Sequence, residues 1–228
     1  MITTLLWDID GTLLDFGKAE EYGIRKCFEV FELGECTDEM LARYSKINRK
    51  YWEMLERNEL TKQQVLSGRF EEFFQTEGID FDRIDDFNVE YQYRLGDKIF
   101  FCDNALETVQ GLKGKVKQYA VTNGTILAQS RKLSQSGLDK VFDDVFISDE
   151  IGHEKPSANF FSAVQDKIGR FSSNNVMIIG DSLTSDIRGG NNAGIICCWY
   201  NPLGLENKDG CKIDYEIKDI AEVIDIIK

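Results

Sequence analysis

Two aspartates, Asp8 and Asp10, end an apolar segment near the beginning of the sequence and precede a Gly11-Thr12 turn. Residues two apart on a β-strand lie on the same face, so the two carboxylates are expected to crowd one end of a buried strand. Like charges at this distance are costly unless a cation or a proton is shared between them. The pair therefore predicts chemistry that uses a shared cation or proton.

Further polar residues follow apolar runs later in the chain. Thr-Asn-Gly at 122–124 and Gly-Asp-Ser at 180–182 each come directly after such a run, and Lys155-Pro156 precedes a predicted helix. Taken singly, these are also an ordinary turn, a helix cap and a helix start. The carboxyl ends of the strands in an open parallel sheet share one edge, where ligands bind. All four motifs together, in this order, therefore predict one site at that edge.

The apolar runs predict the sheet that positions these residues. They are continuous rather than alternating, which is typical of parallel strands covered on both faces. The runs span residues 5–7, 119–121, 145–147, 176–179 and 195–199. Segments of helical length lie between them, at roughly 103–113, 125–136, 157–169 and 184–193. This alternation predicts an α/β fold with a doubly wound parallel sheet of about five or six strands.

Residues 16–98 interrupt this alternation, because they carry helical signals and no comparable strand. Amphipathic helices are expected over 19–33, 38–57 and 82–95, and a capping-box pattern at 61–64 begins another helix. The expected domains are an α/β core of residues 1–15 and 99–228 and an inserted α-helical domain of residues 16–98.

Composition excludes several classes of function. The 228 residues carry a net charge of −13, which argues against binding to nucleic acid polymers or anionic membranes. No apolar stretch reaches the roughly 18 residues of a membrane span, and no secretory signal is apparent, so a cytoplasmic protein is expected. The six cysteines form no C-x-x-C pair and are expected to be reduced thiols. The single histidine, His153, is expected on the surface or in a loop.

The four motifs resemble those of the haloacid dehalogenase-like (HAD) hydrolases. Residues 8–13 (Asp-Ile-Asp-Gly-Thr-Leu) match the first motif, 122–124 the second, Lys155 the third, and 180–182 with Asp186 the fourth. The helical insertion resembles the helical cap of that family, so the resemblance covers essentially the whole chain. It implies a Rossmann-like core with an inserted cap domain.

The resemblance also implies phosphoryl transfer through an aspartyl-phosphate. Asp8 is then the nucleophile, and Asp10 protonates the leaving oxygen and later deprotonates the attacking water. A carboxylate that attacks a phosphate dianion is repelled, so Mg²⁺ is the expected cofactor. The expected metal ligands are the side chains of Asp8 and Asp181 and the backbone carbonyl of Asp10, with Asp186 as an outer partner of these ligands.

The phosphoryl group is expected to be held by the second and third motifs. The Thr122 hydroxyl and the backbone N–H groups of Asn123 and Gly124 would bind its oxygens, and Lys155 would neutralise both the phosphate and the nucleophile. Family members that remove a halide lack the second aspartate, because a halide needs no proton. Asp10 therefore disfavours a dehalogenase, and the missing membrane segments exclude the cation-pump branch.

The expected cap resembles that of bacterial pyrimidine 5′-nucleotidases of this superfamily, over residues 44–52 and 66–70. A nucleoside monophosphate needs an aromatic surface for its base and polar groups at the base edge. Candidates by residue type are Asn48, Trp52, Arg69 and Phe70. The alternative is that Trp52 and Phe70 belong to the apolar stripes of the cap helices.

The sequence therefore predicts a Mg²⁺-dependent phosphomonoesterase that acts on a small phosphorylated metabolite, a nucleoside 5′-monophosphate in the favoured interpretation. The main enzymatic alternative is a sugar or sugar-acid phosphate phosphatase. A phosphomutase is less favoured, and its phosphoryl group would be retained rather than released to water. The alternative from another class is a module that binds phosphorylated metabolites without turnover.

Overall fold

The computed structural model describes residues 1–170 and 174–228. Its contacts divide the chain into two compact units. The first, here called the α/β unit, is made of Met1–Phe16 and Ile99–Lys228, and the second, the helical unit, is made of Gly17–Lys98. The expected domain boundaries differ from these at Phe16 alone.

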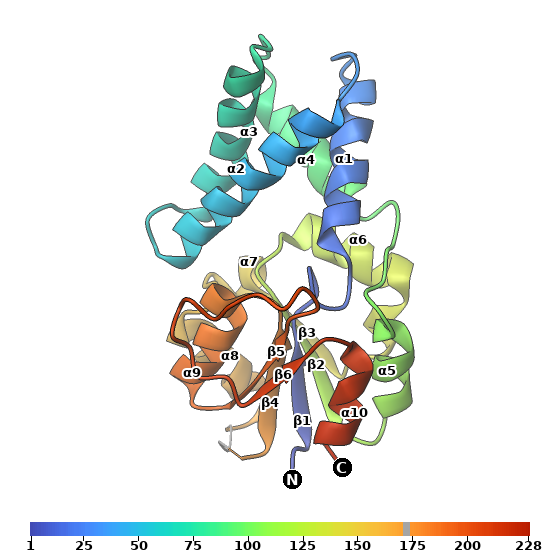
Figure 1. Cartoon of the computed structure of the whole chain (residues 1–228), viewed down its shortest axis with the longest axis vertical. Helices are drawn as coiled ribbons and strands as arrows, with labels where there is room; N and C mark the ends of the chain where they lie inside the picture. The colour runs from blue at the N-terminus through green and yellow to red at the C-terminus, as the bar shows by residue number, and fades with distance from the viewer. Residues whose placement is uncertain (171–173) are drawn as a thin grey trace. The chain divides into compact units, whose positions relative to one another are not determined.

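A six-stranded parallel sheet forms the centre of the α/β unit, in the order β3-β2-β1-β4-β5-β6 (Figure 1). The strands are β1 (Thr4–Trp7), β2 (Lys117–Thr122), β3 (Asp144–Ile147), β4 (Val176–Gly180), β5 (Ile196–Tyr200) and β6 (Tyr215–Ile217). The helices of this unit are α5 (Ala105–Leu112), α6 (Ile126–Ser136), η1 (Leu138–Lys140), α7 (Ser148–Ile151), α8 (Ala158–Ile168), η2 (Leu183–Ile187), α9 (Arg188–Ala193), η3 (Ile220–Glu222) and α10 (Val223–Ile226). This arrangement confirms the predicted α/β doubly wound sheet.

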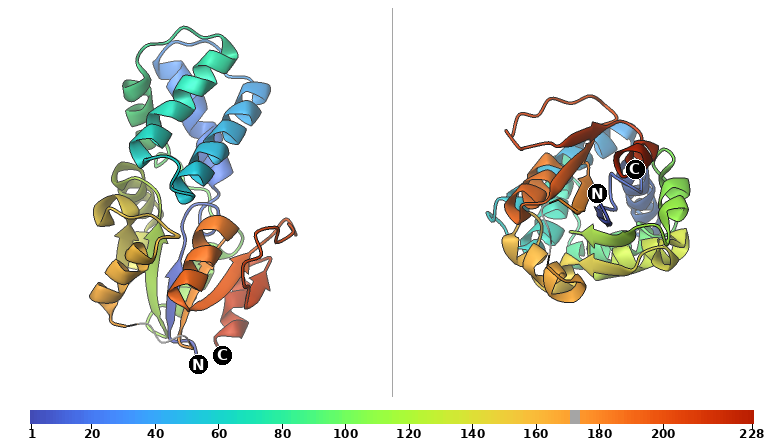
Figure 2. Two further views of the ribbon diagram at one scale, coloured as in Figure 1. Left: turned by 90° about the vertical axis from the view of Figure 1, so that its left-hand side faces the viewer. Right: turned by 90° about the horizontal axis from the view of Figure 1, so that it is seen from below.

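Helices cover both faces of the sheet, with α8 and α9 on one side and α5 and α10 on the other (Figures 1 and 2). The continuous apolar character of β1 follows from this, since successive side chains must be buried on opposite faces. Leu5 and Trp7 pack in one core cluster with Val109 of α5, whereas Leu6 packs in the other with Phe160 of α8. The side chains of Leu5, Leu6 and Trp7 are all fully buried.

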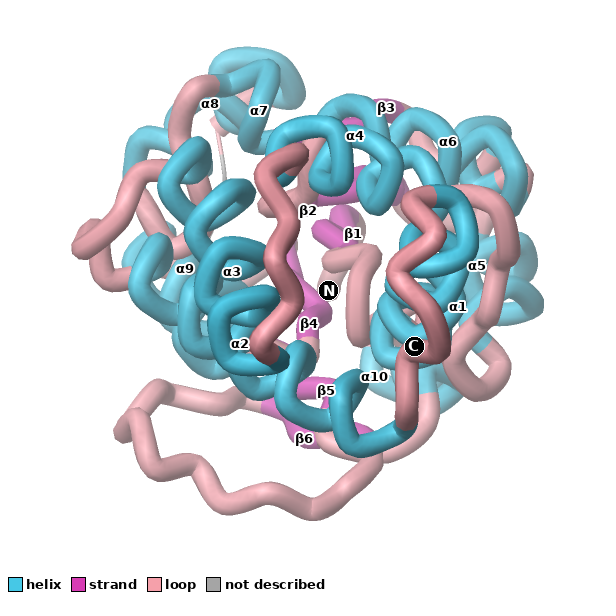
Figure 3. The backbone as a smooth tube through the Cα atoms, turned by 90° about the horizontal axis from the view of Figure 1, so that it is seen from above, coloured by secondary structure: helices cyan, strands magenta, loops and turns pink. Residues whose placement is uncertain are grey.

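Two details differ from the predicted elements. The segment expected as one helix over 184–193 is a π-helical turn, η2, followed by α9. The last strand, β6, was not located by its apolar pattern, because it has only three residues, of which two are exposed. It follows a long loop over residues 201–214, which Figure 3 shows in pink between β5 and β6.

The helical unit contains α1 (Phe16–Val30, whose first residue belongs to the α/β unit), α2 (Asp38–Glu56), α3 (Lys62–Glu77) and α4 (Ile84–Arg94). The predicted capping box is present, with Thr61 and Gln64 bonding reciprocally at the start of α3. The interior of the helical unit is aromatic, and there the rings of Phe28, Phe73, Phe74 and Phe87 pack against one another. None of the described helices is long and apolar enough to cross a membrane.

Candidate active site

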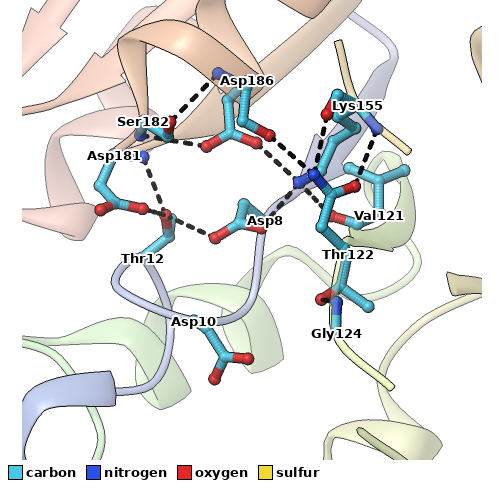
Figure 4. Close-up of polar contacts among 12 residues, drawn as sticks. Asp8, Asp10, Thr12, Val121, Thr122, Gly124, Lys155, Asp181, Ser182 and Asp186 are labelled. Carbon is cyan, nitrogen blue, oxygen red and sulfur yellow. Dashed lines mark hydrogen bonds and ion pairs between the residues drawn. The ribbon is translucent and has the colours of Figure 1, made fainter. Parts of the chain in front are cut away.

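Asp8 lies directly after β1, a central strand with β2 on one side and β4 on the other. The backbone N–H of Asp8 donates to the carbonyl of Ile179 in β4 at 2.9 Å, and Asp8 is only 7% exposed. Because β2 and β4 flank β1 in parallel register, the turns that follow them meet Asp8 at one edge. Figure 4 shows Thr122, Lys155 and Asp181 around Asp8, so the structure brings the four motifs together.

Lys155 connects Asp8 to the fourth motif. Its ammonium group donates to Oδ1 of Asp8, Oδ1 of Asp186 and the carbonyl of Val121, each at 2.7 Å. The residue is 1% exposed, and the three bonds match the three donors of an ammonium group. A buried cation with all its donors used is held in one place, so Lys155 presents a fixed positive charge to Asp8.

Asn123 fixes the backbone of Lys155. The side-chain amide of Asn123 accepts from the Lys155 backbone N–H and donates to the Lys155 carbonyl, both at 2.8 Å. It also donates to the Ser185 hydroxyl at 3.2 Å. Asn123 therefore joins the second and third motifs through its side chain. The backbone N–H of Gly124 donates to the Thr122 hydroxyl at 3.1 Å, so this N–H group points into the turn formed by residues 122–124.

Thr12 joins the first motif to the fourth. Its hydroxyl lies 3.2 Å from Oδ2 of Asp8 and 3.2 Å from Oδ1 of Asp181, and it accepts from the Asp181 backbone N–H at 3.1 Å. The turn requires Gly11, whose φ is +95° and whose Cβ, if present, would lie 2.6 Å from Oδ2 of Asp181. The Gly-Thr sequence after the aspartates therefore serves to bring Asp181 against Asp8.

The acid cluster is electrostatically strained. Burial raises the pKa of Asp8 from its ordinary 3.8 to about 7, against the opposing effect of Lys155, and the charge of Asp186 raises it further. The pKa of Asp181 is well above its usual range, because the surrounding protein removes water from its carboxylate and because Asp8 and Asp186 repel the charged form. Burial alone would lower the pKa of Lys155, but Asp186 and Asp8 outweigh it and the pKa is raised. The site therefore favours additional positive charge.

The same cluster is a candidate metal centre. Carboxylate oxygens of Asp8, Asp181 and Asp186 lie within 4.8 Å of one another. Asp186 is committed to Lys155 and to the backbone N–H of Ser182, whereas the carboxylate of Asp181 contacts only the Thr12 hydroxyl among the contacts above. Oxygen donors of this kind are the ligands that Mg²⁺ prefers.

Asp10 makes a different set of contacts. Its Oδ1 accepts from Nζ of Lys132 and its Oδ2 from Nε2 of Gln129, both at 2.6 Å. Its side chain is 21% exposed and points away from Asp8 in Figure 4. The two aspartates of the first motif are therefore held by separate partners.

The predicted substrate residues Asn48 and Arg69 lie inside the helical unit. Arg69 is 1% exposed, and its guanidinium donates to Oδ1 of Asn48 at 2.8 Å and to Oδ1 of Asn88 at 3.0 Å. Asn48 in turn donates to Oε1 of Glu20 at 2.8 Å. These contacts join α1, α2, α3 and α4 through one buried polar network, so in this structure Asn48 and Arg69 hold the helical unit together.

The two predicted aromatic contacts differ from each other in exposure. Phe70 is fully buried, with its ring stacked on Tyr44 at a centroid distance of 5.3 Å and an interplanar angle of 8°. This is the arrangement of a core residue, which the alternative interpretation of the apolar stripe anticipates. Trp52 of α2 is half-buried and keeps exposed surface. Of the two rings, Trp52 is the one that has surface available to a ligand.

Several site residues were not singled out from the sequence. Thr12 stands inside the first motif, but its bridging role depends on the turn at Gly11. Gln129 and Lys132 were missed, although their spacing of three residues on a helix places them on one face. That helix begins directly after the predicted phosphate-binding turn, which was the available signal.

The comparisons with known proteins agree with this geometry. The sequence model of the haloacid dehalogenase-like hydrolases matches residues 2–194, so the chain belongs to this hydrolase family. The match confirms the resemblance inferred from the four motifs.

Three curated relatives align over nearly the whole chain. The HAD-hydrolase YfnB of Bacillus subtilis is 35% identical over 226 residues, which cover 98% of this chain and 94% of that protein. The pyrimidine 5′-nucleotidase PynA of Streptococcus pneumoniae is 35% identical over 228 residues, with 98% and 94% covered. The pyrimidine 5′-nucleotidase YjjG of Escherichia coli is 26% identical over 219 residues, with 96% and 95% covered. The family and the two nucleotidases support the predicted enzyme class, a phosphoric monoester hydrolase.

A crystal structure of YfnB bound to magnesium matches the fold closely. The TM-score is 0.93 at 34% sequence identity, and the match covers 100% of this chain and 99% of that chain. The α/β fold with its helical insertion is therefore the fold of this family.

Proposed function

We propose that the protein is a magnesium-dependent phosphomonoesterase that forms an aspartyl-phosphate on Asp8 and acts on nucleoside 5′-monophosphates. The observation that carries the proposal is the contact of Asp8 with Lys155 at 2.7 Å inside a cluster of carboxylates. A structural ion pair needs one acid and one base, whereas this cluster has more acids than its single lysine can neutralise. Such an excess of carboxylates fits a site that binds a cation and reacts with a phosphoester.

The proposed reaction has two steps. A carboxylate oxygen of Asp8 attacks phosphorus, the ester P–O bond breaks, and Asp10 gives its proton to the departing oxygen. Water then attacks phosphorus, Asp10 accepts a proton from that water, and the bond between phosphorus and Asp8 breaks. Lys155 stays in contact with Asp8 and offsets the negative charge of both transition states.

The Thr122 turn is proposed to hold the phosphoryl oxygens. The Thr122 hydroxyl and the backbone N–H of Gly124, which bond to each other at 3.1 Å, would both turn to the substrate. The backbone N–H of Asn123 would add a third donor, while its side chain keeps Lys155 in place. Donors fixed before the substrate arrives cost no reorganisation during the reaction.

The residues present fit a divalent cation. Burial and mutual repulsion raise the pKa values of Asp8 and Asp181, which is the effect expected when carboxylates are assembled for a cation. The proposed ligands are the side chains of Asp8 and Asp181 with the backbone carbonyl of Asp10, and Asp186 holds Lys155 beside them. When bound, Mg²⁺ would neutralise the carboxylates and draw a phosphoryl oxygen toward Asp8.

The substrate class is supported by the relatives. PynA and YjjG are pyrimidine 5′-nucleotidases that align with nearly the whole of this chain. We propose that the helical unit acts as the substrate-selecting cap and that Trp52 supplies an aromatic surface for the base. Trp52→Ala is then expected to raise KM for nucleotides while leaving a small aryl phosphate unaffected, whereas equal changes on both would contradict the assignment.

The experiment that tests the function is phosphate release from a panel of pyrimidine and purine nucleoside 5′-monophosphates and sugar phosphates, with Mg²⁺ and with EDTA. Asp8→Asn is compared with Asp139→Asn, an exposed aspartate of the same unit. We expect Mg²⁺-dependent hydrolysis that favours pyrimidine nucleotides, is lost in Asp8→Asn and is retained in Asp139→Asn. Mass spectrometry of acid-quenched enzyme is expected to find a phosphoryl group on the peptide that contains Asp8.

Each alternative has its own outcome in the same panel. Faster hydrolysis of sugar phosphates than of nucleotides would replace the substrate class and keep the mechanism. Binding of phosphorylated metabolites without release of phosphate would identify a binding module. Wild-type turnover by Asp8→Asn would overturn the nucleophile assignment.

A further inference from the structure

Two residues of α6 hold the carboxylate of Asp10 from both sides. Nζ of Lys132 lies 2.6 Å from Oδ1, and Nε2 of Gln129 lies 2.6 Å from Oδ2. Each oxygen therefore has its own donor, which restricts both the direction and the rotation of the carboxylate. Neither Lys132 nor Gln129 belongs to the four motifs.

Both donors are buried, so the contact is costly to break. The side chain of Lys132 is 2% exposed, and its ammonium lies 5.2 Å from the centre of the Phe16 ring. Gln129 is fully buried. If Asp10 turned away, a buried ammonium and a buried amide would lose their carboxylate partner. The position of Asp10 is therefore held more firmly than its partial exposure indicates.

Gln129 also contacts the predicted phosphate-binding turn. A Cβ placed on Gly124 would lie 2.1 Å from Nε2 of Gln129, so the amide fits against this backbone only because residue 124 is glycine. The same side chain has a buried Oε1 with no hydrogen-bond partner. Because the Oε1 acceptor of Gln129 is left unsatisfied, we attribute the placement of this amide to its Nε2 donor, which bonds to the Asp10 carboxylate.

We propose that Lys132 and Gln129 are positioning residues that aim the carboxyl group of Asp10 for proton transfer. This inference rests on the proposed function, in which the Asp10 O–H proton moves to the departing ester oxygen as the P–O bond breaks. The same carboxylate then takes a proton from the attacking water. Lys132 and Gln129 act through Asp10 and transfer no proton themselves.

The test compares two esters that differ in their need for an acid. The alkoxide of a nucleoside 5′-monophosphate must be protonated as it leaves, whereas the nitrophenolate of p-nitrophenyl phosphate leaves without a proton. The ratio kcat/KM reports the steps up to the first bond cleavage, so it isolates this requirement. Lys132→Met is expected to lower kcat/KM for the nucleotide about 10- to 100-fold, the effect of a misplaced general acid, and to leave the aryl ester largely unchanged.

Gln129→Leu provides a second variant in case the loss of Lys132 impairs folding, and the same selective loss is expected. The matched controls are Lys140→Met, at an exposed lysine of η1, and Gln135→Leu, at an exposed glutamine of α6. Neither control is expected to change the ratio of the two kcat/KM values. Thermal unfolding of every variant checks that the fold is retained.

A double-mutant cycle tests whether Lys132 acts through Asp10. Asp10→Asn with Lys132→Met is expected to lose no more nucleotide activity than Asp10→Asn alone, because the group to be aimed is already missing. Equal losses on both esters, additive losses in the cycle, or a rise in nucleotide activity would each overturn the inference. If the wild-type protein hydrolysed neither ester, the proposed function itself would fail instead.

Discussion

In the absence of a divalent cation, the free energy of unfolding is expected to fall as the pH rises from about 5 to about 8. The cause is Asp8, whose pKa is raised by burial from 3.8 to about 7. Between these two values the folded protein keeps a proton on Asp8 that the unfolded chain has lost. Unfolding then releases a proton, so raising the pH favours the unfolded state.

The magnitude follows from the same two values. Each pKa unit corresponds to about 1.4 kcal/mol, so the rise from 3.8 to about 7 amounts to a destabilisation of about 4 kcal/mol at full ionisation. This destabilisation is absent below pH 3.8 and complete above about pH 7. Asp8→Asn cannot ionise at this position and is therefore expected to be more stable than the wild-type protein at pH 8, by up to about 4 kcal/mol.

The assay is urea unfolding followed by circular dichroism at several pH values, for wild-type protein and Asp8→Asn, in EDTA and in Mg²⁺. Because a metal ion binds the deprotonated carboxylate, the gain in stability from Mg²⁺ is expected to be larger at pH 8 than at pH 5. Asp139→Asn serves as the control and is expected to follow the wild-type curve. The chain has one histidine, and Asp181, whose pKa is also raised, acts in the same direction. The contribution of Asp8 is therefore taken from the difference between the wild-type protein and Asp8→Asn.

Two results would refute the reasoning. A wild-type stability in EDTA that is flat or rises between pH 5 and 8 would show that Asp8 is not the strained acid of the site. A gain from Mg²⁺ that is equal at pH 5 and pH 8 would show that the ion does not bind to this carboxylate.

Four further substitutions test the contacts one at a time. Lys155→Met leaves the carboxylates of Asp8 and Asp186 without their buried cation and is expected to cost about 3–5 kcal/mol in urea unfolding at pH 8, and less at pH 4. Arg69→Met removes the donors to two asparagines and is expected to cost about 1–3 kcal/mol, seen as faster hydrogen exchange in the helical unit. Phe70→Ala empties a fully buried site and is expected to lower stability by about 3–5 kcal/mol in urea unfolding. Gly11→Ala pushes against Asp181 and is expected to weaken Mg²⁺ binding in isothermal titration, where an unchanged affinity would contradict the proposed ligand.

The positions of the acids were predictable from the sequence, whereas most of their partners were not. Asp8 and Asp181 follow apolar runs, and the geometry of a parallel sheet brings the ends of such runs to one edge whatever the details of packing. The sequence places Gln129 and Lys132 on one face of a helix that begins after the second motif, but it does not show that this face is turned toward Asp10. Asn123 is similar, since its pairing with the Lys155 backbone joins residues 32 positions apart.

The helical unit shows the limit of assigning roles by residue type. Arg69 and Asn48 have polar side chains that suit a nucleotide base, yet the structure uses them in a buried network with Glu20. A buried polar residue and a ligand-binding polar residue have the same composition and spacing, and only burial separates them. The apolar stripe correctly indicated a core position for Phe70, because burial on one helix face is a local property.

The charge of the site explains how a protein with a net charge of −13 can take an anionic substrate. The contact group of Asp8, Asp181, Asp186 and Lys155 contains three carboxylates and one ammonium, which leaves a net charge of −2 when all are ionised. A divalent cation cancels this charge, and a phosphate dianion can then enter without net repulsion from its nearest neighbours. The affinity for phosphate is therefore expected to depend steeply on the Mg²⁺ concentration. Asp186→Asn changes the net charge of the group from −2 to −1 and is expected to make this dependence on Mg²⁺ weaker, even if the substitution also shifts Lys155. If the affinity for inorganic phosphate were the same in EDTA and in Mg²⁺, Lys155 and the backbone donors would be sufficient to bind phosphate. The excess of carboxylates could then not be explained by binding of a cation.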